Sequence, residues 1–393
     1  MSFNIWTDCP RVPITQLLEF IVDNRGKTVP TALSGHKLIA TNCVTNNTLF
    51  PVYEKVRYLS DETYRTWFRA HPIPGDILFV NKGTPGRVCM VPDPVDFCVA
   101  QDMIALRADD SKIYNKYLFA VLRSNEIQTQ IYNTNVGDVI PHFKKQFMDQ
   151  LLIPVPERKI QEAIGDLYYT LSYKIEHNKK INDNLQQQAS ALYGKFFPYS
   201  IADELPAGWR VGTVGEIVEI HDSKRIPLSG AQREKMEKRI YPYYGAASLM
   251  DYVDEYIFDG KYLLLGEDGT VVDDAGYPIL QYVWGQFWVN NHAHILTGKM
   301  GFNVESLLLL FKRTPVKSIV TGAVQPKISQ GNLRSVPVVI PPAEELEAFN
   351  ELIRPMFDQI RQNHDQNRAL AAIRDALLPK LMSGEVDVST IQL

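Results

Sequence analysis

Apolar residues recur with helical spacing in two long stretches of the chain. A heptad seam can be drawn along each stretch, and every seam position except Arg374 is apolar or asparagine. The first seam runs through Ile164, Tyr168, Leu171, Ile175, Asn178, Asn182, Leu185, Ala189, Leu192 and Phe196, and the second through Phe349, Ile353, Met356, Ile360, Asn363, Asn367, Leu370, Arg374, Leu377 and Leu381. A lone helix would expose such a stripe to water, so the pattern predicts two long helices that pack as a coiled coil.

Two asparagines lie near the middle of each seam: Asn178 and Asn182 in the first, Asn363 and Asn367 in the second. A buried asparagine costs stability unless its amide is paired, and it is best understood as fixing the register between the helices. An antiparallel pair would match 178 with 367 and 182 with 363, whereas a parallel pair would match 178 with 363. We favour the antiparallel pair, since it suits two similar units related by a two-fold axis; the alternative is that each helix packs only on its own globular half. Pro355 should kink or interrupt the second helix.

Outside these helices the pattern changes to short β-type runs separated by Pro, Gly and Asn. The first half contains the runs Val52 to Tyr58, Asp76 to Val80, Arg87 to Val91 and Phe97 to Ala100, then a helical stretch from Asn115 to Ile131. The second half contains Tyr252 to Phe258, Tyr262 to Leu265, Tyr277 to Leu280, Gln286 to Val289 and His294 to Leu296, then an apolar stretch from Leu307 to Phe311. This alternation predicts an α+β domain with an irregular sheet in each half.

The two halves are related by a sequence repeat at a constant offset in residue number. Its clearest copies are Gly137-Asp-Val-Ile-Pro141 and Gly322-Ala-Val-Gln-Pro326, an offset of 322 − 137 = 185, and each continues into one of the long helices. The starts of the halves correspond at a larger offset, as in Asp23 with Asp222 (222 − 23 = 199), so the first half is the longer one, by 199 − 185 = 14. The expected organisation is two pseudo-symmetric globular domains, 1–155 and 199–340, two spacer helices, 156–198 and 341–383, and a C-terminal tail, 384–393.

Composition and charge narrow the class of protein. With 45% hydrophobic and 22% charged residues in 393, the chain is an ordinary globular protein, and its net charge of −4 does not suggest a uniformly basic body. The N-terminus has no signal-peptide pattern and the longest apolar run, Leu307 to Phe311, is too short to cross a bilayer, so we expect a cytoplasmic protein. Cys9, Cys43, Cys89 and Cys98 have neither C-x-x-C nor zinc spacing and are expected to be reduced thiols.

Catalytic interpretations find little support. The only Pro-Pro pair follows Ile340, so the Asn/Asp-Pro-Pro-Phe/Tyr motif of an adenine methyltransferase is missing. His292 and His294 could share one face of a strand, but no Asp, Glu or Cys with ligand spacing accompanies them. We therefore expect no catalytic residue, no bound metal and no cofactor in this chain.

The order of these features, repeated in both halves, resembles the specificity (S) subunit of type I restriction-modification systems over essentially the whole chain. The segments that carry the resemblance are Pro74 to Arg87 and Ala100 to Asp102 in the first half, and Tyr241 to Gly245, Leu265 to Gly269 and Asn290 to His294 in the second. The resemblance implies a non-catalytic DNA-binding subunit in phage defence and DNA methylation. Each half would read one part of a split, asymmetric double-stranded target, and the helices would set the spacing.

The same resemblance implies the partners. The helical region would dock two modification (methyltransferase) subunits, which bind S-adenosylmethionine, and restriction (motor and nuclease) subunits, which use ATP and Mg²⁺, would join them. No membrane partner is implied.

Candidate DNA contacts follow from side-chain chemistry, because Arg and Lys suit guanine and Asn and Gln suit adenine in the major groove. The base-reading candidates are Lys82, Thr84, Arg87 and Gln101 in the first half, and Tyr243, Tyr244, Asn290, Asn291 and Gln325 in the second. The candidates for phosphate contacts are Lys144, Lys145, Lys224, Arg225 and Lys327. For each of them, a role as a solvated or turn residue is a competing interpretation, and the tyrosines could instead pack in the sheet.

Two other functions stay open on the sequence alone. Asp93, Asp110 and Lys112 loosely fit the paired acids and lysine that hold Mg²⁺ in many nucleases, so the chain could be a stand-alone Mg-dependent DNA endonuclease. A scaffold that only joins partner proteins is the third possibility, and it would show no sequence-selective DNA binding at any salt concentration.

Overall fold

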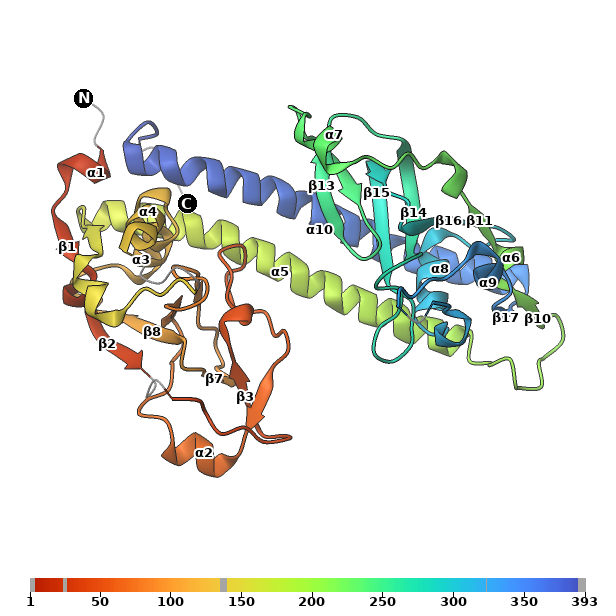
Figure 1. Ribbon diagram of the computed structural model, residues 1–393, viewed down its shortest axis with the longest axis horizontal. Coiled ribbons are helices and arrows are strands. Elements are labelled where there is room, and N and C mark those ends of the chain that lie inside the picture. The colour runs from red at the N-terminus through yellow and green to blue at the C-terminus, as the bar shows by residue number, and fades with distance from the viewer. Residues whose placement is uncertain (1–3, 24–26, 135–139, 323, 388–393) are drawn as a thin grey trace. The chain divides into compact units, whose positions relative to one another are not determined.

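The chain folds into two compact units. The computed structural model describes residues 4–23, 27–134, 140–322 and 324–387 (Figure 1). Unit 1 is Met1–Lys180 with Asn363–Leu393, and unit 2 is Ile181–Gln362. Each unit therefore contains a globular part and one portion of each long helix, α5 (Arg158–Phe196) and α10 (Ala343–Ser383). The repeat residues 137–139 and the end of the tail, 388–393, lie outside the described residues.

The two long helices run antiparallel within each unit. In unit 1 the buried Asn178 amide donates to Asn367 Oδ1 at 2.9 Å and to Gln366 Oε1 at 2.6 Å. In unit 2 the Asn182 amide donates to the carbonyl of Ile360 at 3.3 Å. Residue numbers rise along one helix as they fall along the other, so the expected antiparallel coiled coil is confirmed. Helices packed only on their own halves are excluded.

Helix α10 continues through Pro355, so the proline does not interrupt the helix, whereas a kink at this position stays a prediction. Ile353 and Phe357, on either side of the proline, are both buried in the core of unit 2. A proline inside a helix removes one backbone donor and costs about 3 kcal/mol. Packing of the adjacent turns offsets that cost, as expected where tertiary contacts rather than propensity hold a helix.

Unit 1 contains three small sheets. The four-stranded antiparallel sheet has the order β2 (Leu18–Asp23), β8 (Met103–Ala108), β5 (Ile77–Val80), β6 (Val88–Met90). The three-stranded sheet has the order β4 (Arg57–Leu59), β3 (His36–Ile39), β7 (Phe97–Val99), with β3 and β7 parallel. The ends of the domain meet where β1 (Arg11–Pro13) pairs with β9 (Leu152–Pro154). The helices are α1 (Ile5–Asp8), α2 (Asp61–Thr66), α3 (Asn115–Leu122) and α4 (Asn125–Thr134), with 3-10 turns η1 (Ile14–Leu17), η2 (Thr41–Cys43) and η3 (Lys145–Gln150).

Unit 2 contains one large sheet and a closing pair. The six-stranded sheet has the order β11 (Val218–Ile220), β16 (Ala293–Gly298), β14 (Phe258–Gly266), β15 (Leu280–Val289), β12 (Tyr241–Tyr244), β13 (Leu249–Val253). The domain closes where β10 (Arg210–Thr213) pairs with β17 (Pro337–Ile340). The helices are α6 (Val214–Ile217), α7 (Gly230–Glu234), α8 (Val304–Phe311) and α9 (Gln330–Arg334), with 3-10 turns η4 (Asp222–Lys224) and η5 (Lys317–Ile319).

The two units share one sheet plan, which confirms the predicted pseudo-symmetric α+β architecture. The strand order β2-β8-β5-β6 of unit 1 corresponds to β11-β16-β14-β15 of unit 2, and the parallel pair β3–β7 corresponds to the parallel pair β12–β15. The single strand β15 therefore takes the places of both β6 and β7, which residues 91–96 separate in unit 1. Part of the length difference between the halves arises in this way.

A buried helix lies at the centre of each core. All eight residues of α8 are buried, and its N-terminus is capped by Asn303, whose side chain accepts from the Ser306 amide at 2.7 Å. In unit 1 the expected helix 115–131 is two helices, α3 and α4. Helix α3 ends just before Arg123. The side chain of Arg123 points into the core and donates to the carbonyls of Thr45 and Val88. The predicted strand 252–258 was also wrong, because it spans the connection between β13 and β14.

Candidate nucleic-acid interface

Three loops of unit 1 are held together by backbone hydrogen bonds. The Asn81 amide donates to the Asp102 carbonyl (3.1 Å), Gly83 to Pro141 (2.9 Å) and Phe143 to Asn81 (2.8 Å). We call residues 81–87, 100–102 and 141–145 the first loop cluster. It follows the ends of β5 and β7, where the sheet stops and side chains can face a ligand rather than the core.

Three loops of unit 2 make the same hydrogen bonds. The Glu267 amide donates to the His292 carbonyl (2.8 Å), Gly269 to Pro326 (3.0 Å) and Ile328 to Glu267 (2.8 Å). The backbones of Asp268 and Lys327 form an isolated antiparallel β-bridge, and the backbones of Lys82 and His142 form the matching β-bridge in unit 1. We call residues 267–271, 290–292 and 325–330 the second loop cluster. One backbone arrangement is thus built twice.

The side chains on this shared backbone differ between the units. The equivalent pairs are Asn81 and Glu267, Lys82 and Asp268, Asp102 and His292, His142 and Lys327. In the first cluster, partial burial and then the nearby charges of Lys82 and Lys144 lower the pKa of His142. The first cluster is therefore locally positive, whereas the second holds carboxylates at two of the corresponding positions.

All the predicted contact residues of the first half that the structure places belong to the first loop cluster. Lys82, Thr84 and Gln101 are partly buried, and Arg87 is exposed. The hydroxyl of Thr84 and Oε1 of Gln101 are buried atoms without a hydrogen-bond partner in the described part of the chain. An unsatisfied buried polar group is costly, so we expect a water molecule or a ligand group to pair with each of these two atoms. Of the phosphate candidates, Lys144 is exposed and Lys145 pairs with Asp23.

The second half is divided. Asn291, Gln325 and Lys327 are exposed in the second loop cluster. Asn290 is buried and shapes its loop: Oδ1 accepts from the His292 amide at 2.8 Å. A buried Asn290 that accepts from the backbone of its own loop is better explained as a residue that shapes the loop than as one that contacts a DNA base.

The two tyrosines lie in the sheet. Tyr243 is 1% exposed, with its hydroxyl against Leu228 and the Arg233 guanidinium over its ring. Tyr244 is partly buried and meets Phe287 edge-on at 5.9 Å between ring centroids. These contacts favour the packing interpretation over base stacking for both side chains.

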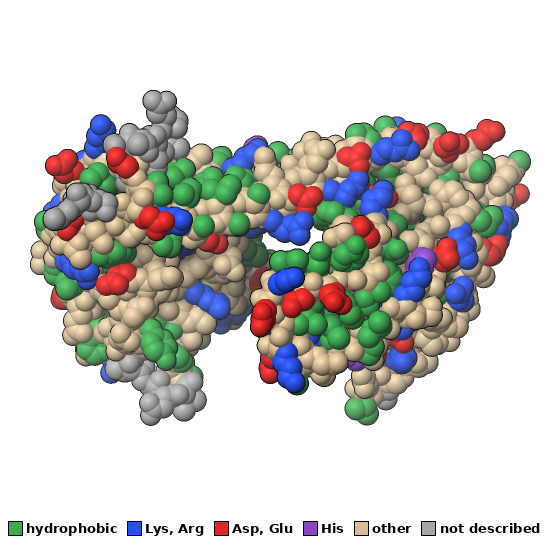
Figure 2. Space-filling view, turned by 90° about the horizontal axis from the view of Figure 1, so that it is seen from above, with side chains coloured by type: hydrophobic (Ala, Val, Ile, Leu, Met, Phe, Trp, Pro, Cys, Tyr) green, Lys and Arg blue, Asp and Glu red, His purple; other side chains and the backbone are tan. Residues whose placement is uncertain are grey.

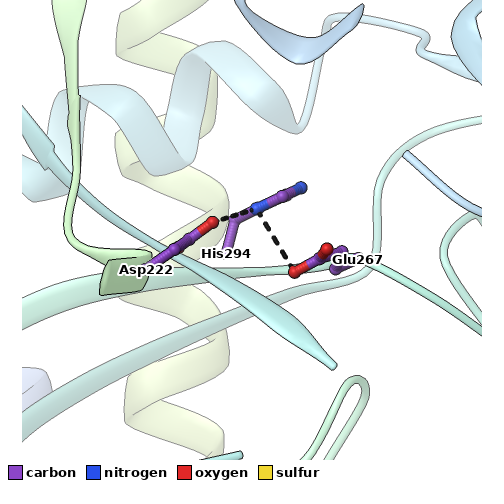
Figure 3. A group of neighbouring side chains, drawn as sticks. All are labelled: Asp222, Glu267 and His294. Carbon is purple, nitrogen blue, oxygen red and sulfur yellow. Dashed lines mark hydrogen bonds and ion pairs between the residues drawn. The ribbon is translucent and has the colours of Figure 1, made fainter. Parts of the chain in front are cut away.

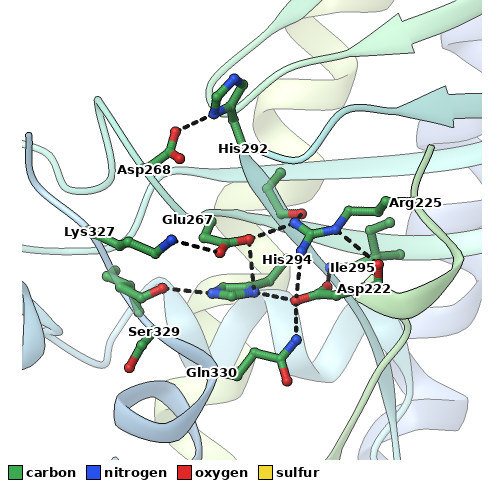
Figure 4. Close-up of polar contacts among 12 residues, drawn as sticks. Asp222, Arg225, Glu267, Asp268, His292, His294, Ile295, Lys327, Ser329 and Gln330 are labelled. Atoms are coloured by element: carbon green, nitrogen blue, oxygen red, sulfur yellow. Dashed lines mark hydrogen bonds and ion pairs between the residues drawn. The ribbon is translucent and has the colours of Figure 1, made fainter. Parts of the chain in front are cut away.

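A charge network under the second loop cluster involves residues that sequence reasoning did not bring together. His294 Nδ1 lies 2.6 Å from Asp222 Oδ2 and 3.7 Å from Glu267 Oε2 (Figure 3). Arg225 donates to Glu267 at 2.6 Å, and Lys327 lies 3.3 Å from the other Glu267 oxygen (Figure 4). Arg225, a phosphate candidate, is thus largely buried between two carboxylates, while Lys224 beside it is exposed.

Three side chains of this network, Asp222, Glu267 and His294, form the one group among the described residues whose ligand atoms lie close enough together to hold a metal ion. Ligand atoms of Asp222, Glu267 and His294 lie within 4.8 Å of one another. The expectation of no metal rested on the lack of an acid at ligand spacing in the sequence, which did not foresee that two acids from other segments lie beside His294 in the fold. The contacts nevertheless describe an ion-pair network: the Arg225 guanidinium already supplies the cation, and His294 Nε2 faces the Ile328 carbonyl at 2.8 Å. The repeat that aligns Asp23 with Asp222 was the one sequence signal for this network.

The surface charge is mixed. In the face drawn in Figure 2, lysine and arginine side chains are interspersed with acidic ones rather than gathered on one broad basic face. Of the nuclease candidates, Asp110 pairs with Arg158 at 2.9 Å and Lys112 with Asp109 at 2.9 Å, so these two are paired with different residues rather than with each other.

Comparison with known proteins identifies the family. The chain matches the family described as type I restriction modification DNA specificity domain twice, at residues 31–187 and 206–370. It is 23% identical over 350 residues to the type I restriction enzyme MjaIX specificity subunit of Methanocaldococcus jannaschii, covering 81% of this chain and 79% of that protein. It is 32% identical over 127 residues, 32% of each chain, to a putative type I restriction enzyme specificity subunit of Haemophilus influenzae.

A solved structure agrees with the fold. The S subunit of a type I restriction-modification system from M. genitalium matches with a TM-score of 0.55 at 17% identity, covering 95% of this chain and 96% of that one. The two family matches together span most of the sequence. The chain therefore belongs to the type I restriction-modification DNA specificity family and contains two copies of its domain.

Proposed function

We propose that this chain reads a bipartite, asymmetric sequence in double-stranded DNA and directs the methyltransferase and restriction subunits of a type I complex to it. The observation that carries this proposal is the pair of loop clusters, in which the same three backbone hydrogen bonds present different side chains. A shared backbone with divergent polar side chains is what two readers of different sequences need.

Lys82 and Arg87 are the strongest base-reading candidates of unit 1, because both belong to the first loop cluster and Arg87 is exposed. Thr84 and Gln101 add polar atoms that lack a partner within the described residues. In unit 2 we retain Asn291 and Gln325 as base readers and Lys224 and Lys327 as phosphate contacts, with Lys144 and Lys145 serving the latter role in unit 1. Arg225, Tyr243, Tyr244 and Asn290 have structural contacts that account for them.

The chain is the specificity subunit and not the catalytic one, in keeping with its family and relatives. A stand-alone nuclease and a scaffold without DNA binding gain no support from them. We propose that α5 and α10 space the domains 1–155 and 199–340, with Asn178, Asn182, Asn363 and Asn367 fixing their register and the tail following at 384. We further propose that the helices dock two modification subunits carrying S-adenosylmethionine, that restriction subunits using ATP and Mg²⁺ join them, and that the complex works in the cytoplasm.

Genome-wide mapping of methylated positions, in a host with and without this gene, tests the proposal. We expect methylation at a split motif with two defined half-sites and an undefined gap. A single uninterrupted motif, or no difference between the hosts, would contradict it. The purified chain incubated alone with DNA and Mg²⁺ should produce no cleavage, and cleavage would instead favour the nuclease alternative.

A further inference from the structure

The core beneath the loop clusters is apolar in unit 1 and charged in unit 2. In unit 1, Ile104 of β8 pairs with Phe79 of β5, two residues before Asn81. In unit 2, His294 of β16 pairs with Leu265 of β14, two residues before Glu267. The two positions are equivalent, and both side chains are almost completely buried, at 1% and 0% exposure. The fold therefore accepts an apolar residue at this position, so a buried histidine there needs another explanation.

The hydrogen bonds determine the protonation of His294. Nδ1 lies 2.6 Å from Asp222 Oδ2, and Nε2 lies 2.8 Å from the Ile328 carbonyl oxygen. A carbonyl oxygen only accepts hydrogen bonds, and so does an ionised carboxylate. Both ring nitrogens must then carry protons, which makes the ring an imidazolium.

Asp222 is ionised, by the same reasoning. Its oxygens also accept from the Ile295 amide at 2.9 Å and from the Gln330 side chain at 2.6 Å, so every neighbour is a donor (Figure 4). Burial raises the pKa of Asp222, but the hydrogen bond and charge of His294 outweigh it and hold the pKa below the ordinary 3.8. A neutral His294 would leave one nitrogen lone pair facing an oxygen.

The groups around the ring come from four segments. Asp222 and Arg225 follow β11, Glu267 follows β14, His294 is in β16, and the Ile328 carbonyl with Lys327 and Gln330 belongs to the 325–330 loop and α9. Through Nε2, the ring holds the backbone of that loop directly. The loop also carries Gln325 and Lys327, which are exposed candidates for DNA contact.

We propose that His294, as a buried imidazolium, is a positioning residue that fixes the 325–330 loop, so that DNA selectivity in unit 2, and not in unit 1, depends on its charge. The inference rests on the proposed function. Ile104, at the equivalent position of unit 1, is apolar and cannot hydrogen-bond to a loop backbone. The corresponding loop of unit 1 is instead connected to Asp23 by the ion pair of Lys145.

The test compares the two half-sites on one molecule. The full chain, assembled with its modification subunits, is titrated with duplexes carrying its methylation-mapped target and with duplexes carrying one wrong base pair in either half. In the unmodified protein a wrong base pair should weaken binding by about 5- to 150-fold in both halves. With His294→Ile, the residue that unit 1 uses, this penalty should fall at least about tenfold, or disappear, in the half-site read by unit 2 and stay within about twofold in the other. The unchanged half-site verifies that unit 1 is folded, and dispersed methyl NMR signals from unit 2 of the variant verify that the substituted unit is folded as well.

A second variant separates the charge of His294 from its hydrogen bonds. His294→Gln keeps an amide that can donate to the Ile328 carbonyl but carries no positive charge, so it should lose selectivity in the unit 2 half-site as His294→Ile does. Equal loss in both half-sites, or full unit 2 selectivity in His294→Gln, would overturn the proposal. If the unmodified protein discriminates in neither half-site, the proposed function itself fails.

Discussion

The two loop clusters share their backbone and differ in the charges beneath and upon it. The first cluster has Lys82 where the second has Asp268, and its core position Ile104 is occupied in unit 2 by His294. The hydrogen bonds between loops are made by main-chain atoms and place no demand on side chains, which can therefore vary without loss of the scaffold. Main-chain hydrogen bonds therefore hold the loops together, and the side chains on the loops are free to differ between the two units.

A second contrast concerns the buried helix of each core. The second residue of α3 is Lys116, a partly exposed side chain that pairs with Asp166 at 2.6 Å. The second residue of α8 is Glu305, only 3% exposed, which accepts from Lys261 and Tyr282 at 2.7 Å and from Arg361 at 3.0 Å. Unit 2 thus buries charge at two places where unit 1 does not, and the units should respond differently to pH.

The largest effect should come from the positive side chains of the first cluster. Lys82→Ala with Arg87→Ala should reduce affinity for the cognate duplex by at least about 30-fold, because base contacts by such side chains contribute about 1–3 kcal/mol each. Fluorescence anisotropy at fixed salt measures it.

Arg65→Ala with Arg69→Ala is the matched control. It removes the same charge from exposed arginines of unit 1 outside the first loop cluster, and it should change affinity far less. Unchanged affinity of the Lys82 and Arg87 double variant for its cognate site would remove these residues from the interface.

Acid should unfold unit 2 before unit 1. Burial raises the pKa of Glu305, but Lys261 and Tyr282 outweigh it and lower the pKa below the ordinary 4.5, and the pKa of Asp222 is likewise held below 3.8. A lowered pKa in the folded state adds stability above the ordinary pKa, and that stability is lost as pH falls through the folded value. Methyl NMR spectra recorded as the pH decreases below about 4.5 should lose dispersed signals of unit 2 first.

Glu305→Gln sharpens this comparison. It should cost about 3 kcal/mol at neutral pH, as expected when one partner of a buried ion pair is removed, and it should reduce the acid sensitivity of unit 2. Simultaneous loss of signals from both units would show that the buried charges of unit 2 do not set its acid stability.

The sequence was most informative where a period or a repeat carried the structure. The seam asparagines predicted the antiparallel pairing of Asn178 with Asn367, and the repeat predicted two units. The seam is local, and the repeat keeps a constant offset within each shared segment, so both signals are visible without three-dimensional knowledge.

The network around His294 shows what could not be predicted. Its carboxylates, Asp222 and Glu267, come from segments far from His294 in the chain, and strand pairing alone brings them together. The burial of Tyr243 was also hidden, because a tyrosine in a β run suits a packed sheet and an exposed platform equally well. Candidate sites on loops were identified by residue type, but their grouping depended on main-chain hydrogen bonds.

The approach of the long helices to the buried helices also differs between units, and Gly165 tests it. A Cβ at Gly165 of α5 would lie 2.6 Å from the Tyr117 amide nitrogen of α3, so that contact requires glycine. The repeat places Asn350 of α10 at the corresponding position. There is room for a side chain there, and the Asn350 amide donates to the Gly301 carbonyl at 2.8 Å. Gly165→Ala should destabilise unit 1 by about 1–3 kcal/mol through overpacking, and Asn350→Ala should cost unit 2 at most about 1 kcal/mol. Chemical denaturation followed by signals from each unit measures both, and equal costs would refute the difference in helix approach.

The smallest effect concerns the asparagine pair of unit 1, and it needs a double-mutant cycle. Asn178→Leu leaves the partly buried Asn367 side chain without the donor that Asn178 supplies, and should cost about 1–3 kcal/mol. Adding Asn367→Leu replaces the amide pair with apolar side chains in the seam, which is often neutral or stabilising, so the double variant should recover most of that loss. If register is the purpose of the pair, the recovered stability should come with loss of a unique alignment, seen as duplicated NMR signals from residues beside the seam. A double variant that is as stable as the original and gives a single set of signals would show that other contacts set the register.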